Sequence, residues 1–443
     1  MNTKKFLNTV IATFSTEVGI HILNLLSTII IVRNLSTYDF GIYSLIISFS
    51  FTLCYLSSIG LPQAIIFFIG KEKEPEKILI SIYLFLFFCF GICTVIIAFL
   101  CKDYLLNSFL HEIPKNYFPL LLIIYFFTLF DAFLLSIIRG KKNFLLFNVR
   151  KILTPAGNLS GIVFLYLIAS INLKNVVLIS MGITVILTLW FFFKVIPKSY
   201  YKFNYNWNII KSLLGYGIKS YIQAISGHLI YQIDLYIIAY ILNAREVAFY
   251  SIAVGMATLL WYIPNTVGTV LFPSLSSLND EKNIHLVSAL INRNTLFITF
   301  LSSLVMGFTG KYLISFFYGD HYNSSVNAMI YLLPGIVMMS SYKILTRNFS
   351  SRNRQQISII SATTAFIVNV GLNFILIPEY GIEGAAIAST ISYILAGIIL
   401  IVIFKGDSNL SFREILLVEK TDIKFYLTMI SRFKNHKNCN KTS

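Results

Sequence analysis

The sequence is poor in charged residues. Only 12% of its 443 residues are Asp, Glu, Lys or Arg, whereas 56% are hydrophobic, and the mean hydropathy is +0.75. Soluble globular domains carry about 25% charged residues, and no water-soluble core absorbs so much apolar surface. We therefore expect the chain to use the lipid bilayer as its solvent.

Residues that form disulfides, metal sites and catalytic groups are scarce. The five cysteines follow neither a disulfide pattern nor a zinc pattern. We find no Ser/His/Asp constellation, no phosphate-cradling glycine motif and no predicted external loop longer than about 20 residues. The sequence argues against an enzyme and predicts neither a metal nor an organic cofactor.

Apolar runs of about 20 residues recur twelve times, separated by short polar segments. This rhythm predicts an all-α integral membrane protein with about twelve transmembrane helices. The first run contains Glu17 and leads to no small-residue cleavage site, so we expect it to remain as a span rather than a signal peptide. The predicted spans cover residues 10–32, 39–69, 78–100, 117–138, 152–171, 175–193, 213–241, 247–272, 295–318, 326–346, 356–377 and 384–404.

Acidic residues are fewer than basic ones, 19 against 35, which gives a net charge of +16. In a soluble protein this excess would suggest nucleic acid as a partner, but here the basic residues sort by loop. On these spans, 28 of them fall on one face, six on the other, and Lys219 lies inside a span. The positive-inside rule then places both termini in the cytoplasm, and we expect no nucleic-acid partner.

The longest polar interruptions, residues 194–212 and 405–443, divide the chain. They predict an N-terminal six-helix bundle over 1–205, a C-terminal six-helix bundle over 206–405 and a basic cytoplasmic tail over 406–443. Because six is even, both halves enter the membrane from the same side and form parallel repeats. The tail is either an amphipathic stretch on the anionic inner leaflet or a solvated segment.

A local repeat supports this duplication. Residues 39–44 (DFGIYS) correspond to residues 246–251 (EVAFYS) at an offset of 207 residues. At the same offset Leu35 matches Leu242, and His21 matches His228. The register therefore extends over a whole predicted helix and the turn that follows it.

Glycine and proline mark two special places. Gly60 and Pro62 are expected to let the second span bend, because glycine has no side chain and proline lacks a backbone donor, although loop punctuation gives the same pattern. Gly381, Gly384 and the alanines that follow are expected to let the hairpin between the last two spans pack backbone against backbone.

Three stretches carry a family resemblance: residues 33–43 (RNLSTYDFGIY), 60–63 (GLPQ) and 378–388 (PEYGIEGAAIA). In their order and spacing they resemble the Wzx-type polysaccharide (O-antigen and capsule) flippases. That family belongs to the exporter superfamily that also contains the MATE multidrug antiporters and the lipid II flippases. The resemblance covers essentially the whole chain.

The resemblance implies two six-helix bundles around a central cavity and a transport function without chemistry on the substrate. The substrate would be an undecaprenyl-diphosphate-linked oligosaccharide, flipped by alternating access from the cytoplasmic to the periplasmic leaflet of a bacterial inner membrane, for O-antigen, capsule or lipopolysaccharide-related synthesis. Membrane lipids, a polysaccharide polymerase and a chain-length regulator are the other partners it suggests.

An acidic sugar diphosphate needs a wet, cationic path through the membrane, so basic residues near the spans are candidates for the substrate cavity. Lys219 lies inside the seventh span, although a snorkelling lysine would look the same. Arg139, Lys343 and Arg347 lie at cytoplasmic span ends, where ordinary positive-inside anchoring is the alternative.

Three acids fall within spans: Glu17, Asp131 and Asp234. A carboxylate in low dielectric can bind H⁺ or Na⁺ and couple transport to an ion gradient. The alternative is a structural ion pair, for instance between Asp131 and a basic residue of a neighbouring helix. His21 and His228, at equivalent places in the two repeats, are further cavity candidates that would respond to pH or contact sugar, unless neighbouring helices simply satisfy them.

Two rival functions remain open at this point. A membrane polysaccharide polymerase would also be polytopic and basic, but would need an external loop to hold its active site. A cation-coupled drug antiporter of the same superfamily would need an acidic and aromatic cavity. A lipid II flippase is a closer cousin, but its family usually carries two additional helices.

Overall fold

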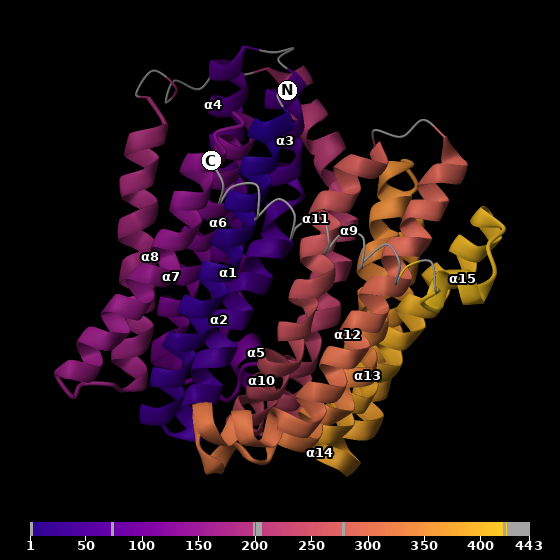
Figure 1. The fold of residues 1–443 in the computed structure, drawn as a ribbon. Coiled ribbons are helices and arrows are strands. Elements are labelled where there is room, and N and C mark those ends of the chain that lie inside the picture. The colour runs from indigo at the N-terminus through magenta and orange to yellow at the C-terminus, as the bar shows by residue number, and fades with distance from the viewer. Residues whose placement is uncertain are drawn as a thin grey trace, which may run out of the picture. The chain divides into compact units, whose positions relative to one another are not determined.

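The computed structural model describes residues 3–71, 75–197, 200, 206–276, 280–419 and 422. Figure 1 shows that these residues form long helices joined by short turns, and the described part of the chain contains no β-strand. The all-α expectation is confirmed.

The first six predicted spans all appear as helices. Each consists of one helix except the second, which is divided in two, and two short elements, α5 (Lys102–Asn107) and η1 (Lys115–Tyr117), join α4 to α6. The six are α1 (Thr3–Asn34), α2 with α3 (Thr37–Ser58 and Leu61–Lys71), α4 (Glu76–Leu100), α6 (Phe118–Gly140), α7 (Phe144–Leu167) and α8 (Leu173–Val195).

The last six predicted spans are also helical. They are α9 (Trp207–Ile241), α10 with η3 and α11 (Ala244–Thr258, Leu259–Trp261 and Tyr262–Ser276), α12 (Glu281–Tyr318), α13 (Ser325–Ser351) and the two legs of α14 (Gln355–Ser408). The turn η4 (Asp320–Tyr322) joins α12 to α13, and a short helix α15 (Phe412–Leu416) follows α14.

Within the described residues, nine helices are long and apolar enough to cross a membrane by length and composition. The other three predicted spans have identifiable reasons for falling outside that set. α14 is counted once although it contains two spans, α7 carries Asn148, Arg150 and Lys151 in its first half, and α9 is only partly described.

The predicted bend in the second span is present. Helix α2 stops at Ser58, Ile59 and Gly60 adopt positive φ values of 45° and 69°, and α3 begins at Leu61 with Pro62 in its first turn. A side chain at Gly60 would collide with the backbone of Gly217 in α9, so the break also lets two helices approach closely.

The predicted hairpin near the end of the chain is also present. In the 54-residue α14, Gly381 has φ 59° and ψ −138°, which ends one leg and starts the next. Gly384 lies against the carbonyl of Leu376, and Ala385 and Ala386 are fully buried. Backbone packing by small residues therefore closes this turn.

The helix bounds repeat at the predicted offset. α1 ends at Asn34 and α9 at Ile241, and α2 begins at Thr37 and α10 at Ala244, a separation of 207 residues in both cases. The repeat read from the sequence thus matches the structure at this helix-turn-helix.

The chain forms two compact units that do not coincide with the predicted halves. Unit 1 comprises residues 1–254, 311–328 and 366–388, and unit 2 comprises residues 255–310, 329–365 and 389–443. In unit 1, α6 is apolar nearly all round and packs against α2, α3, α4, α7 and α8. In unit 2, a core cluster including Phe349, Phe404 and Ile415 joins α12, α13, α14 and α15.

Part of the predicted tail belongs to the core of unit 2. A capping box between Ser411 and Glu414 starts α15, whose Ile415 is fully buried. Arg293 of α12 binds both carboxylate oxygens of Asp422 at 2.6 Å and the carbonyl of Glu414 at 2.9 Å. Residues 423–443 of the predicted tail lie outside the described residues.

Candidate transport site

Asp131 lies in a buried ion pair inside unit 1. The Arg150 guanidinium of α7 is 2.7 Å from Asp131 Oδ1 of α6, donates to Thr154 and Thr188, and lies over the ring of Phe191. The Arg150 side chain is only 1% exposed. Of the two roles left open for Asp131, this geometry favours the structural ion pair.

Arg150 is a buried charged residue inside a span that the sequence does not identify as a candidate. The predicted fifth span begins at residue 152, which leaves Arg150 in the preceding loop. The helix starts eight residues earlier, with the Asn143 side chain accepting from the Leu146 amide as N-cap, so Arg150 lies inside it. The Asn143 cap was the available signal.

Glu17 and Lys151 form a second, more open pair in unit 1. Lys151 Nζ lies 2.5 Å from Glu17 Oε1, with the two side chains 29% and 41% exposed. His21 follows Glu17 by one turn of α1 and is half-buried. Glu17 thus also has a basic partner on a neighbouring helix.

His228 belongs to a polar seam between α2 and α9 in unit 1. Its Nε2 lies 2.8 Å from the Thr52 hydroxyl, and its ring stacks on Tyr55 at 4.1 Å between ring centroids. Thr52 also bonds Tyr236, which contacts Ser48. The seam places hydroxyl, imidazole and aromatic groups together on two helices.

Asp234 is the most deeply placed of the three acids. It is 1% exposed, and it accepts from Tyr250 Oη at 2.7 Å and from Asn373 Nδ2 at 2.6 Å. Asn373 Nδ2 also donates to Asn369 Oδ1, while Asn373 Oδ1 is buried without a hydrogen-bond partner. The buried Asp234 carboxylate of α9 is thus held by a hydroxyl from α10 and an amide from α14, and a carboxylate of this kind inside a span is a candidate for binding H⁺ or Na⁺.

Two basic candidates lie together in unit 2. Lys343 and Arg347 are one turn apart on α13, which places them on the same face. Lys343 Nζ lies 4.4 Å from the Trp261 ring centroid, and Arg347 approaches Gly268 of α11. Trp261 is itself fixed by a hydrogen bond from its indole to the Ile336 carbonyl. The pair offers two cationic groups on one helix face, with Lys343 beside an aromatic ring.

The other two basic candidates are less informative. Arg139 is exposed in the last turn of α6. Lys219 belongs to α9, but its side chain lies outside the described residues. Across the residues that the structure does describe, no group of three or more His, Cys, Asp or Glu is placed to hold a metal ion.

Long apolar helices with polar groups buried among them are the features of a multi-pass membrane protein. Residues 30–327 match the model of the family described as polysaccharide biosynthesis protein, and the chain belongs to that family.

Relatives and solved structures agree with this assignment. The chain is 23% identical over 386 residues to a putative O-antigen transporter of Shigella flexneri. The matched region covers 83% of this chain and 90% of that protein. Its fold is similar to the lipid II flippase MurJ in an inward closed conformation (TM-score 0.76, 20% identity, 90% of this chain and 87% of that one). It is also similar to an inward-facing MATE family multidrug transporter (TM-score 0.72, 15% identity, 90% and 98%).

These comparisons confirm two expectations from the sequence. The family resemblance is correct, and the similar proteins are transporters and flippases rather than enzymes.

Proposed function

We propose that this protein flips undecaprenyl-diphosphate-linked oligosaccharide units from the cytoplasmic to the outer leaflet of a bacterial inner membrane, for synthesis of a surface polysaccharide. The observation that carries the proposal is the match to an O-antigen transporter over nearly the full length of both chains. The excess of basic residues in alternate loops supports cytoplasmic termini.

The mechanism we propose is alternating access by the two predicted six-helix repeats, residues 1–205 and 206–405. Supporting features are the broken helix at Ile59 and Gly60 and the interrupted helix at η3, since such breaks allow bundles to bend. A polymerase and a chain-length regulator would take over the flipped unit on the outer face.

Lys343 and Arg347 are the residues we propose to meet the diphosphate. Two cations one turn apart match a group with several anionic oxygens, and the Trp261 ring beside Lys343 limits how far its ammonium can withdraw. We also propose four other residues for the cavity: Lys219, Arg139, His21 and His228. His228 lies beside the Thr52 hydroxyl and the Tyr55 ring, a setting suited to binding sugar hydroxyls.

Gene deletion in a host that makes its own polysaccharide tests the function. We expect surface polymer to disappear and lipid-linked units to accumulate facing the cytoplasm. The wild-type gene should restore polymer, whereas the Lys343→Ala, Arg347→Ala double variant should not restore it. The control variant Lys282→Ala, which removes an exposed cation of the same unit, should restore polymer. Units that reach the outer leaflet unpolymerised would instead indicate a polymerase, and unchanged polymer would redirect attention to drug export.

Asp234 is the residue we propose for ion coupling, because its carboxylate is 1% exposed and is held by hydrogen bonds from Tyr250 and Asn373 of two other helices. Asp234→Asn should remove the dependence of flipping on an imposed H⁺ or Na⁺ gradient, whereas Glu17→Gln, at a half-exposed ion pair, should retain it. Gradient dependence that persists in Asp234→Asn would exclude this role for Asp234.

A further inference from the structure

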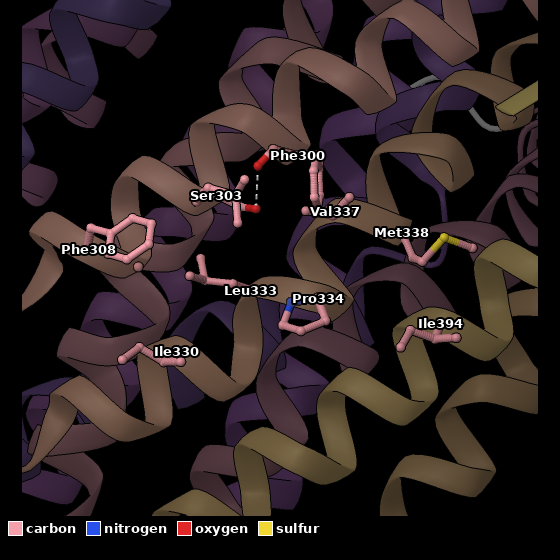
Figure 2. Close-up of a pocket in the computed structure, with 11 residues that line it drawn as sticks. Phe300, Ser303, Phe308, Ile330, Leu333, Pro334, Val337, Met338 and Ile394 are labelled. Carbon is pink, nitrogen blue, oxygen red and sulfur yellow. Dashed lines mark hydrogen bonds between the residues drawn. The ribbon is translucent and has the colours of Figure 1, made fainter. Parts of the chain in front are cut away.

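Unit 2 contains a groove of about 510 Å³ between α12, α13 and the second leg of α14. Figure 2 shows its wall, to which α12 contributes Phe300 and Phe308, α13 contributes Leu333 and Pro334, and α14 contributes Ile394. The volume falls within the range of pockets that hold small organic ligands.

The side chains of the groove are apolar almost throughout. Its one polar side chain, Ser303, donates its hydroxyl to the Phe300 carbonyl at 2.7 Å, a bond drawn in Figure 2. Several wall residues are open to the surroundings, with Phe308 81% and Leu304 44% exposed. The groove therefore suits a hydrocarbon ligand that enters from the lipid side.

The groove lies near mid-depth in both predicted spans that build it. Leu304 is nine residues from one end of the span 295–318, about 14 Å at the helical rise, and Pro334 is eight residues, about 12 Å, from the end of the span 326–346. The hydrocarbon half-thickness of a bilayer is about 15 Å. The predicted spans therefore place the centre of the groove close to the midplane of the bilayer.

Depth distinguishes the two kinds of hydrocarbon chain that a membrane offers. An ordinary acyl chain ends near the midplane, so it reaches the groove only with its terminal carbons. A polyprenyl chain of undecaprenyl length is longer than one leaflet and passes the midplane whichever leaflet holds its headgroup. Only the second kind fills a midplane groove from either side.

We propose that this groove binds the polyprenyl chain of the lipid-linked substrate. The inference rests on the proposed function and adds a site to it: the tail stays in the groove of unit 2 while the headgroup exchanges leaflets. Holding the tail keeps the substrate on the protein during transport and allows sugar units of different composition to share one anchor.

The test measures binding of undecaprenol, which has the chain but no diphosphate, to detergent-solubilised protein by native mass spectrometry. Gly307 lines the groove, and a Cβ there would lie 3.5 Å from Leu333 Cδ1, so the indole of Gly307→Trp would occupy the groove. Val305 lies on the same helix at the same depth, is 61% exposed and does not line the groove, so Val305→Trp is the matched control.

We expect undecaprenol to bind Gly307→Trp about tenfold or more weakly than wild type, since several buried methylenes lose contact, and Val305→Trp to bind normally. If Gly307→Trp is not monodisperse, the Leu304→Ala, Phe308→Ala double variant, which removes the exposed wall, should weaken binding in the same direction. Equal binding of undecaprenol to wild type and both groove variants would overturn the proposal.

A palmitoyl-oleoyl phosphatidylglycerol arm separates the substrate chain from ordinary lipid. We expect this lipid to bind weakly and to respond little to Gly307→Trp; binding as tight as that of undecaprenol would overturn the assignment to the polyprenyl chain. If the protein flips the lipid-linked substrate but does not bind undecaprenol, the groove proposal is rejected and the proposed function stands. If it binds undecaprenol but does not flip the substrate, the groove proposal stands and the proposed function is rejected.

Discussion

Arg150 of unit 1 and Arg293 of unit 2 are both buried guanidinium groups paired with aspartate, but they connect different parts of the chain. Arg150 joins α7 to α6 and α8 through Asp131 and Thr188, all within one helix bundle. Arg293 joins α12 to the segment after α14 through Asp422 and the Glu414 carbonyl. The Arg150–Asp131 pair lies inside the helix bundle of unit 1. The Arg293–Asp422 pair holds the segment after α14 against α12 in unit 2.

The difference lies in what each arginine leaves behind when it is removed. Asp131 lies on α6, which packs against α2, α3, α4, α7 and α8, so its charge would remain within the helix bundle. Asp422 follows the short helix α15, and if this segment separated from α12 its carboxylate would return to water. We therefore expect the two pairs to differ in their effect on stability although their chemistry is the same.

The largest effect is expected for Arg150→Met. It leaves the Asp131 carboxylate buried and unpaired, so the free energy of unfolding should fall by about 3–5 kcal/mol. Chemical denaturation of the detergent-solubilised protein measures this change. Adding Asp131→Leu should restore most of it, whereas Arg139→Met, at an exposed arginine, should change little. No loss in Arg150→Met would mean that the pair is solvated.

A smaller effect is expected for Asp422→Asn, which replaces charge-assisted hydrogen bonds to Arg293. The free energy of unfolding should fall by about 1–3 kcal/mol, and backbone amides of residues 411–419 should exchange faster with solvent. Hydrogen exchange measured by mass spectrometry reports the exchange rates of residues 411–419 and of the rest of unit 2. Glu419→Gln, whose carboxylate lies 3.7 Å from Arg293, is the control. Faster exchange across all of unit 2 would contradict a local fastening.

The Arg293–Asp422 fastening should also depend on pH. Hydrogen bonds from the Arg293 guanidinium lower the pKa of Asp422 below its ordinary value. A carboxyl whose folded-state pKa is lowered stabilises fully above its unfolded pKa, near 3.9, and loses this contribution as pH falls through the folded-state value.

Protection of residues 411–419 should therefore stay constant from neutral pH down to about pH 4 and fall only in stronger acid. Hydrogen exchange corrected for the intrinsic pH dependence measures it. Asp422→Asn should remove this acid transition. A loss of protection between pH 5 and 7 would point to a different titrating group.

The smallest effect is expected for Glu17→Gln. The Glu17–Lys151 pair is partly exposed, so its loss should change the free energy of unfolding by only about 0–1 kcal/mol. The same denaturation measurement compares it with Arg150→Met. An effect as large as that of Arg150→Met would show that exposure does not separate the two pairs of unit 1.

Much of the fold could be predicted because its signals are local. Apolar length gave the spans, Gly60 with Pro62 marked a helix break, and Gly381 marked a turn. The offset of 207 residues between DFGIYS and EVAFYS matches the helix bounds around them. Each of these signals acts within one helix or one turn.

The candidate site could be predicted only in part, because pairing depends on distant residues. Asp131 is a candidate from the sequence, but its partner Arg150 is not. The predicted span 295–318 leaves Arg293 in a loop, whereas α12 begins at Glu281. The division into two units crosses α10, α12, α13 and α14, and no local pattern marks it. The contact of Lys343 with Trp261 likewise joins residues 82 positions apart.

The most direct test of the central claim is flipping in proteoliposomes that contain a fluorescent undecaprenyl-diphosphate-linked sugar and a membrane-impermeant quencher outside. We predict that wild-type protein exposes the inner-leaflet fluorophore to the quencher, and that the Lys343→Ala, Arg347→Ala variant does so much more slowly. Folded wild-type protein that leaves the inner-leaflet fluorescence as protected as in protein-free liposomes would contradict the account.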